Sequence, residues 1–207
     1  MSIDLLLDFE SQALFAIFTY LKENPGFHDI NEISEQIGFE KRTTLKYLER
    51  LAMLSNEVKE RIGIAPLTIS ERNYRIIQQN YVENKELSLA IYHISIKIDL
   101  LEGLLLNKEN TMDSLTDKYN LSYSTLKKDV YEVRDFLKEA NIDLHIRNGE
   151  IVLSGLEPTI RLFFLSFFWQ LYGGYGHPFN IENSTEKNFI FEKLSFLLSD
   201  QIDPITR

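Results

Sequence analysis

The stretch from Ile142 to Gly155, IDLHIRNGEIVLSG, constrains the fold of this 207-residue chain more than any other segment. Apolar and polar residues alternate on both sides of Asn148-Gly149, a pair that favours a two-residue type I′ turn. Such a turn sets four apolar side chains on one face, in the pairs Ile146–Ile151 and Leu144–Leu153. The segment therefore predicts a β-hairpin.

Two helices are predicted directly before this hairpin. Thr111 can cap a helix that ends near Tyr119, and Asn120 tolerates the left-handed conformation of a turn. The helix that follows has its apolar residues at helical spacing, at Leu126, Val130, Val133 and Leu137. Helix, turn, helix and hairpin are the order of a winged helix-turn-helix. The same 3/4 spacing predicts one long helix before this unit, from Lys85 to Asn107.

An earlier part of the chain repeats this order. Apolar spacing predicts a helix from Asp8 to Lys22, which Asn24-Pro25-Gly26 ends. A short helix over residues 30–37, a turn at Gly38 and an amphipathic helix over residues 41–54 follow, the last with Leu45, Leu48 and Leu51 inward. Residues 58–78 are interpreted as a β wing. When Thr43-Thr44-Leu45 is aligned with Ser124-Thr125-Leu126, the two turns differ by one residue.

The part beyond Gly155 predicts more helix. EPTIRLFFLSFFWQLYGG begins with Pro158 at a first-turn position and is heavily aromatic, and residues 188–198 form a further apolar segment. We expect a mainly α fold, with winged helix-turn-helix domains at 1–80 and 81–155 and a third, truncated helical domain at 156–207. The exposed apolar surface that such helices leave would alternatively form a homodimer contact.

The net charge of −9 opposes nucleic-acid binding, since phosphates attract a basic surface. Charges are screened beyond about 10 Å, so the local balance decides. The segment from Glu40 to Arg50 is net +2 and the segment from Ser122 to Lys138 is net +1, while many acidic residues lie elsewhere. We therefore expect two mildly basic reading heads on an acidic body.

Recognition helices place their N-terminal residues near base edges and phosphates. In the first unit, the candidates for contact with double-stranded DNA are Lys41, Arg42, Thr43, Thr44, Lys46, Tyr47 and Arg50. In the second unit they are Ser122, Tyr123, Ser124, Thr125, Lys127, Lys128 and Arg134, with Arg147 beside the wing tip. For the second helix, the alternative interpretation is that Ser122 or Ser124 caps it and the lysines form a solvated face. For the first helix, the alternative is a surface helix with i,i+4 pairs.

No other chemistry has a motif in the sequence. Cysteine is absent, which excludes disulfides and thiolate metal sites, and the four histidines lack metal-ligand spacing. Neither a phosphate loop nor a nucleophile elbow is found, so we expect no cofactor and no catalysis. The N-terminus lacks the order of a signal peptide, and no apolar run reaches the roughly 20 residues of a membrane span, so a cytoplasmic protein without membrane contact is expected.

The order of parts resembles the Mga/AtxA family of Gram-positive regulators. The resemblance rests on two successive helix-turn-helix units, on the S-Y-S-T-L start of the second recognition helix, and on the junction Gly155, Glu157, Ile160 and Arg161 leading into the aromatic helix. It implies a transcriptional regulator, usually an activator and often of virulence genes, that binds promoter DNA through both units.

The resemblance also implies PRD-like regulatory domains with phosphorylatable histidines after the DNA-binding half, so residues 156–207 would be the first helices of such a domain. His177 lies in a glycine-rich loop and receives no phosphorylation role. Homodimerisation, RNA polymerase and phosphotransferase-system proteins are the further partners expected of the full-length protein. The rival interpretation is a winged-helix protein–protein interaction module without direct DNA binding.

Overall fold

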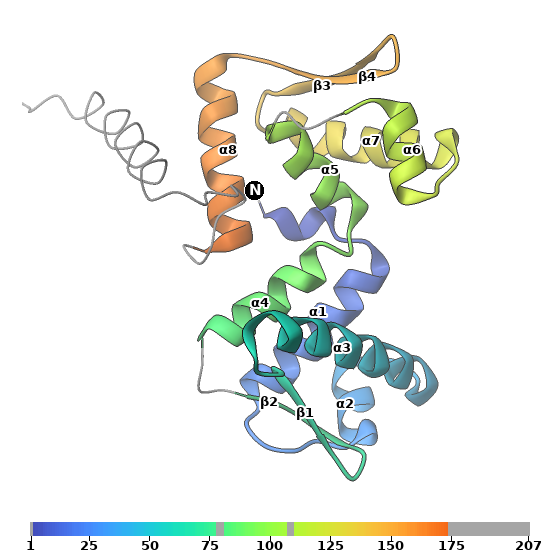
Figure 1. Cartoon of the computed structure of the whole chain (residues 1–207), viewed down its shortest axis with the longest axis vertical. Helices are drawn as coiled ribbons and strands as arrows, with labels where there is room; N and C mark the ends of the chain where they lie inside the picture. Colours follow the sequence, from blue (N-terminus) through green and yellow to red (C-terminus); the bar gives the residue numbers. More distant parts are fainter. Residues whose placement is uncertain (1, 78–80, 107–109, 174–207) are drawn as a thin grey trace, which may run out of the picture. The chain divides into compact units, whose positions relative to one another are not determined.

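The computed structural model describes residues 2–77, 81–106 and 110–173, which fall within one compact body, Met1–Tyr175 (Figure 1). Below, the first and second units are the two winged helix-turn-helix parts of this body. The elements follow one another as η1 (Ile3–Leu6), α1 (Phe9–Glu23), α2 (Ile30–Ile37), α3 (Lys41–Ile62), β1 (Leu67–Ser70), β2 (Asn73–Ile76), α4 (Tyr81–Tyr92), α5 (Ile96–Leu105), α6 (Met112–Tyr119), α7 (Tyr123–Lys138), β3 (Asp143–Arg147), β4 (Glu150–Ser154) and α8 (Glu157–Tyr172). Over the described residues the fold is mainly helical with two small antiparallel sheets, as predicted.

The hairpin predicted around Asn148-Gly149 is present with the predicted register. β3 and β4 pair antiparallel, with Leu144 opposite Leu153 and Ile146 opposite Ile151. Asn148 and Gly149 both have positive φ, at 49° and 83°, as a type I′ turn requires. Alternation and turn chemistry therefore determine this element locally.

The helices of the second unit also begin and end where their caps predict. The Thr111 hydroxyl accepts the backbone N–H of Ser114 at 3.2 Å, and Ser122 does the same for Thr125 at the start of α7. Asn120 ends α6 with φ 51°. The predicted inward residues of α7 are fully buried: Leu126, Val130, Val133 and Leu137.

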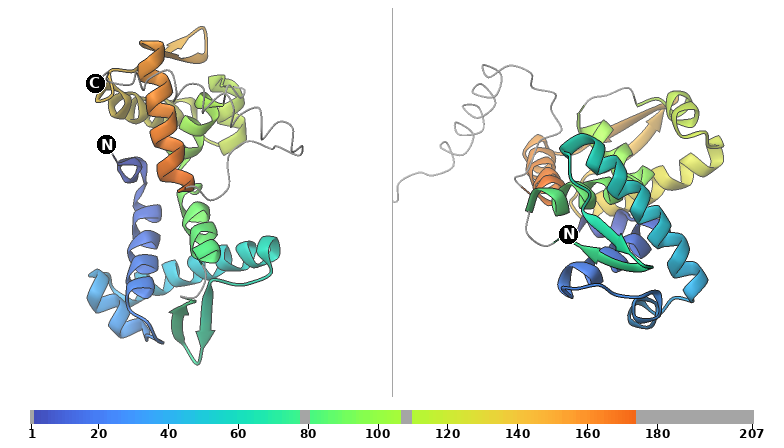
Figure 2. Two further views of the ribbon diagram at one scale, coloured as in Figure 1. Left: turned by 90° about the vertical axis from the view of Figure 1, so that its left-hand side faces the viewer. Right: turned by 60° about the horizontal axis from the view of Figure 1, so that its bottom comes forward.

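In the first unit, α1 and α2 match their predicted ranges, but α3 is longer than predicted. It continues past residue 54 to Ile62, because Leu54 and Val58 prolong the buried stripe, and it ends at Gly63 with φ 85°. The wing consequently begins at β1, later than predicted, and folds back beside α3 (Figure 2).

Each wing is joined to the segment before its own helix-turn-helix. In the first unit, His28 and Tyr74 exchange backbone hydrogen bonds of 3.0 and 2.9 Å. In the second unit, Thr111 forms a bridge with Glu150, flanked by the backbone bonds from Met112 to Gly149 and from Ile151 to Asn110. In both units a residue one or two positions before the first helix of the motif thus forms an isolated β-bridge with the wing, which fixes the wing to the helices.

The single long helix predicted from Lys85 to Asn107 is wrong, because α4 and α5 are separated at residues 93–95. α5 packs in the second core, whereas α4 packs mainly in the first and contributes Leu89 to the second. Leu87 and Ile91 pack with the first unit, whereas Ile98 and Leu101 pack with the second. The buried Ser95 hydroxyl lies at the break and donates to the carbonyl of Leu6 at 2.7 Å. Uniform 3/4 spacing could not show that the buried face changes partner midway.

The core of the second unit also receives residues from both ends of the described chain. Leu6 and Leu7 pack there beside α5 and α7, and the Ile3 backbone N–H donates to Gln170 Oε1 of α8 at 3.2 Å. α8 buries Phe163, Phe167 and Leu171 in the same core and leaves Leu162 and Trp169 exposed.

The predicted boundaries at 80/81 and 155/156 remain predictions. The predicted helix at 188–198 and the loop with His177 lie outside the described residues. None of the described helices is both long and apolar enough to cross a membrane.

Candidate nucleic-acid interface

The two helix-turn-helix motifs have the same spacing. Residues 38–40 separate α2 from α3, and residues 120–122 separate α6 from α7. The predicted one-residue difference between the turns is therefore wrong, and the sequence alignment was shifted by one position. In the structural register Thr44 corresponds to Leu126, Leu45 to Lys127, and Lys46 to Lys128.

This register corrects two predicted DNA contacts in the first unit. Thr44 is fully buried, and its hydroxyl donates to the Glu40 carbonyl at 3.2 Å. Tyr47 is also buried, in the core with Leu48 and Leu51, so neither side chain can reach DNA from this position. Leu45, predicted to face inward, is 39% exposed. Thr44 was predicted to contact DNA because a polar residue at a buried position cannot be recognised from the spacing of hydrophobic residues.

The remaining α3 candidates form an exposed cationic start of a helix. Lys41, Arg42 and Lys46 are exposed and Thr43 is half-buried, and the first turn contains no acidic residue. Within the described residues, no carboxylate forms an ion pair with any of these three cations; Lys46 lies over the Tyr47 ring at 5.3 Å. Arg50 differs, because its Nε pairs with Glu10 at 3.4 Å. The backbone N–H of Glu32 is the main cause that lowers the pKa of Asp29, the N-cap of α2, and Lys41 also lowers it. The first two turns of α3 therefore present positive charge that no ion pair among the described residues holds.

The α7 start is exposed but nearly neutral. The Ser122 hydroxyl lies 2.9 Å from the Ser124 hydroxyl and 2.8 Å from the Thr125 hydroxyl, and Tyr123 projects from the same turn with 48% exposure. The alternative interpretation that Ser122 caps the helix is thus also correct. Hydroxyls and free backbone N–H groups at a helix start can bind phosphate oxygens, and hydroxyls can also bind base edges.

The cations further along α7 are held by neighbouring side chains. Tyr131 lies between Lys127, at 5.5 Å from its ring centre, and Arg134, at 4.4 Å. Lys128 pairs with Glu132 at 3.8 Å but keeps 78% of its side chain exposed. Arg134 pairs with Asp135 at 3.4 Å. Of the α7 cations, Lys127 and Lys128 can most easily give up these contacts and bind a phosphate instead.

Acidic groups on α7 balance these cations. Glu132 accepts Lys97 Nζ at 2.8 Å, and this bond lowers the Glu132 pKa. Burial raises the pKa of Asp129, and the neighbouring Glu132 raises it further. The second wing adds Arg147, which is exposed beside the β3–β4 turn. α7 is therefore a weaker electrostatic surface than α3.

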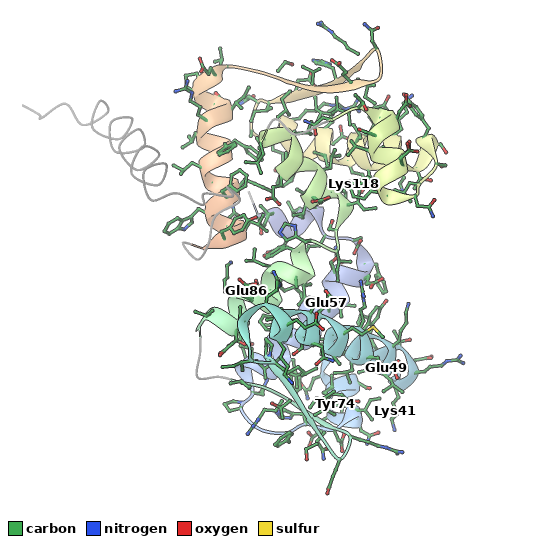
Figure 3. All side chains as sticks on the ribbon, viewed as in Figure 1. Lys41, Glu49, Glu57, Tyr74, Glu86 and Lys118 are labelled. Atoms are coloured by element: carbon green, nitrogen blue, oxygen red, sulfur yellow. The ribbon has the colours of Figure 1, made fainter. Side chains whose placement is uncertain are left out.

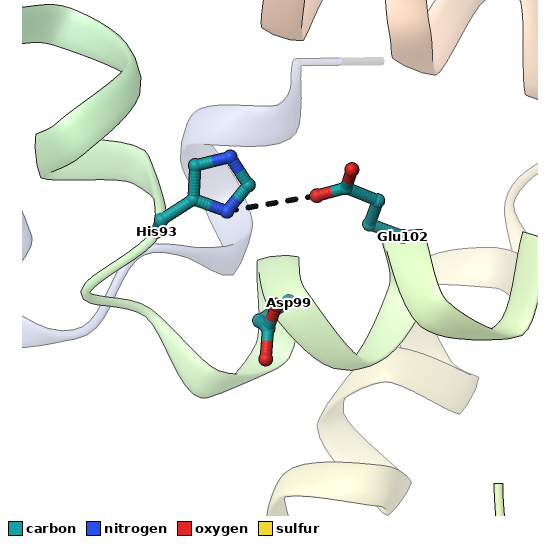
Figure 4. A group of neighbouring side chains, drawn as sticks. All are labelled: His93, Asp99 and Glu102. Atoms are coloured by element: carbon teal, nitrogen blue, oxygen red, sulfur yellow. Dashed lines mark ion pairs between the residues drawn. The ribbon is translucent and has the colours of Figure 1, made fainter. Parts of the chain in front are cut away.

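A polar cluster outside these surfaces was missed by sequence analysis. His93, Asp99 and Glu102 have potential metal-ligand atoms within 4.8 Å of one another, and His93 Nδ1 lies 3.5 Å from Glu102 Oε2 (Figure 4). Both carboxylates already have partners from other helices, since Tyr172 donates to Glu102 at 2.8 Å and both Lys118 and Tyr119 donate to Asp99. The cluster connects α5 with α6 and α8, and only the folded arrangement reveals it.

The ionisation of this cluster follows from its contacts. Burial alone would raise the pKa of Asp99, but the hydrogen bonds from Lys118 and Tyr119 bring it below its usual range. Burial raises the pKa of Tyr119 and of Tyr172, and the carboxylates beside them add to the effect. Asp99 is consequently anionic at neutral pH and both tyrosines are protonated donors.

Two helix-turn-helix motifs, each with a hairpin joined to the segment before it and an exposed second helix, define a tandem winged helix-turn-helix protein. Residues 79–168, which contain the second of these units, match the family model of the Mga helix-turn-helix domain. The chain therefore carries an Mga helix-turn-helix domain, consistent with the Mga-like family that its sequence resembles. This is a DNA-binding regulatory domain and not an enzyme family. No curated protein matches the chain.

Proposed function

We propose that this chain binds double-stranded DNA through both winged helix-turn-helix units and regulates transcription in the cytoplasm, as an activator of the Mga/AtxA type. The observation that supports this proposal most strongly is the start of α3, where Lys41, Arg42 and Lys46 are exposed together without a carboxylate partner among the described residues. The Mga domain over residues 79–168 supports the same function for the second unit.

The roles follow from charge and position. In the first unit, Lys41, Arg42 and Lys46 would bind phosphates, and Thr43 would approach the groove. In the second unit, Ser122 to Thr125 would bind the backbone and base edges at the start of α7, with Lys127, Lys128 and Arg147 on flanking phosphates. Because α7 is nearly charge-balanced, we infer that both units together provide the affinity. A homodimer would add to it in the same way.

The test is fluorescence anisotropy with a mixed-sequence duplex at two salt concentrations. The Lys41→Ala/Arg42→Ala/Lys46→Ala and Lys127→Ala/Lys128→Ala variants should both bind more weakly, by roughly tenfold at low salt, and each phosphate that is no longer bound should reduce the salt slope by about 1. Lys59→Ala is the matched control, because this exposed lysine lies near the opposite end of α3.

Absence of salt-dependent binding by the parent would contradict the proposal. That result would favour the protein–protein interaction module, for which the exposed Leu162 and Trp169 of α8 offer an apolar contact surface. If the parent binds and only the α3 variant is weakened, then the second unit is not a phosphate-binding head.

A further inference from the structure

The two wings end in turns of the same length but with very different residues. In each hairpin, two residues connect the last paired positions, Glu71-Arg72 in the first and Asn148-Gly149 in the second. All four have positive φ, and Glu71 and Arg72 lie at 51° and 70°. Asn-Gly suits this geometry, whereas long side chains are disfavoured there. The first wing therefore keeps an arginine in a conformation that turn formation alone would not select.

Backbone strain of this kind concentrates at binding sites, so an observed outlier justifies a search for a ligand. Arg72 is exposed, and no ion pair holds its guanidinium among the residues that the structure describes. It is carried by a supported hairpin: the buried Tyr74 packs in the core with Leu48 of α3, and Arg75 lies 4.6 Å from the Phe27 ring. Arg72 is thus an exposed cation at the tip of a hairpin that is packed against the rest of the first unit.

Packing of the hairpin against α3 relates this wing to the recognition helix: β1 contacts α3, and Tyr74 of β2 shares a core with Leu48. Figure 3 labels Tyr74 on the wing and Glu49 on α3. Burial raises the pKa of the Tyr74 hydroxyl, Glu49 raises it further, and Arg72 opposes the shift. Arg72 precedes β2 by one residue, and Tyr74 of that strand packs with Leu48 in the half of α3 that also carries the exposed Lys46. A duplex that meets the start of α3 would bring a phosphate strand toward the wing.

We propose that Arg72 is a phosphate-binding residue of the first wing, and that its guanidinium binds the DNA backbone beside the groove entered by α3. This inference rests on the proposed function. The planar guanidinium matches two phosphate oxygens, which a lysine cannot do. Glu71 places a negative charge on the same tip and weakens this contact.

The test uses two substitutions that change the backbone in the same way and the charge in opposite ways. Arg72→Gly and Glu71→Asn both place a residue suited to positive φ in the turn, so both should raise the thermal unfolding midpoint. Arg72→Gly should weaken duplex binding roughly fivefold on every sequence and reduce the salt slope by about 1. Glu71→Asn should strengthen binding.

Arg72→Asn serves as a second variant without a cation, since Asn also tolerates this conformation. If Arg72→Gly and Arg72→Asn both bind with the parent's affinity and salt slope, the inference is wrong. Failure of this inference can be distinguished from failure of the proposed function. If only the inference fails, the parent still binds duplex DNA and the Lys41→Ala/Arg42→Ala/Lys46→Ala variant still binds less tightly. A parent that binds no duplex contradicts the proposed function and this inference together.

Discussion

Asp99 shows how a single side chain connects helices of the second unit. It accepts hydrogen bonds from Lys118 and Tyr119, which the helix-turn-helix presents, and its pKa lies below the ordinary range because of them. A depressed carboxyl pKa stabilises the fold above the unfolded pKa of about 3.9, and this stabilisation disappears as the pH falls through the folded-state value.

We therefore expect Asp99→Asn to lower the free energy of unfolding by about 1 to 2 kcal/mol at pH 7, because two donors lose a charged acceptor. The difference from the parent should begin to shrink below the unfolded-state pKa of about 3.9 and should disappear as the pH falls through the lower pKa of Asp99 in the folded protein. Urea unfolding at pH 7 and at pH 3.5 measures both values. Asp117→Asn, an exposed position on α6, is the control. An equal cost at both pH values would contradict the assignment.

At the scale of elements, α3 shows that a helix can be predicted from sequence more reliably than the face of that helix that is buried. Its start and amphipathic character follow from the leucine spacing. Its register does not, since Thr44 is buried where the second unit has Leu126, and Leu45 is exposed beside it. Which polar residue fills a core position depends on what packs against it, and that information is not local.

The same distinction explains the rest of the fold. The β3–β4 hairpin, the caps at Thr111 and Ser122, and the left-handed Asn120 all depend on neighbours within a few residues, and all were predictable. The break between α4 and α5 depends on contact with Leu6, distant in sequence, and the alternation and spacing of residues 85–107 contain no sign of it. The cationic start of α3 was predictable as charge, but its freedom from carboxylate partners among the described residues was not.

The orientation of α3 gives a prediction at this scale. Thr44→Val should leave duplex affinity unchanged, because the side chain faces the core, and should change the free energy of unfolding by no more than about 1 kcal/mol. Thr43→Val is the matched change at the neighbouring, half-buried position and should weaken binding. Anisotropy titration and thermal unfolding of both variants separate the two roles. A loss of affinity in Thr44→Val as large as in Thr43→Val would show that the register is different in solution.

At the scale of the whole molecule, the two units are linked by the segment before α1. Leu6 is buried among α5 and α7 in the second core, while Leu5 beside it is 65% exposed. A fragment restricted to residues 79–168 would lack Ile3, Leu6 and Leu7 and would expose the surface that they cover. Residues outside this range therefore complete the core of the second unit.

Leu6→Ala should lower the free energy of unfolding by about 2 to 5 kcal/mol, the usual cost of emptying a buried leucine site. Leu5→Ala should cost less than about 0.5 kcal/mol. Hydrogen exchange followed by mass spectrometry locates the effect: amides of α5 and α7 should exchange faster in Leu6→Ala, and those of α2 should change less. If α2 responds as strongly as α5 and α7, the segment does not belong to the second core alone.

The docking of residues 3–7 has a consequence for synthesis on the ribosome. A nascent chain grows at about 5 to 20 residues per second, and Leu6 meets Ser95 across 89 positions and Ile3 meets Gln170 across 167. The core around α1 and α3 uses residues from Ala13 to Ile91 and can close while translation continues. Ile3, Leu6 and Leu7 must stay exposed until α7 and α8 have emerged, so these residues are translated well before they can reach their native partners.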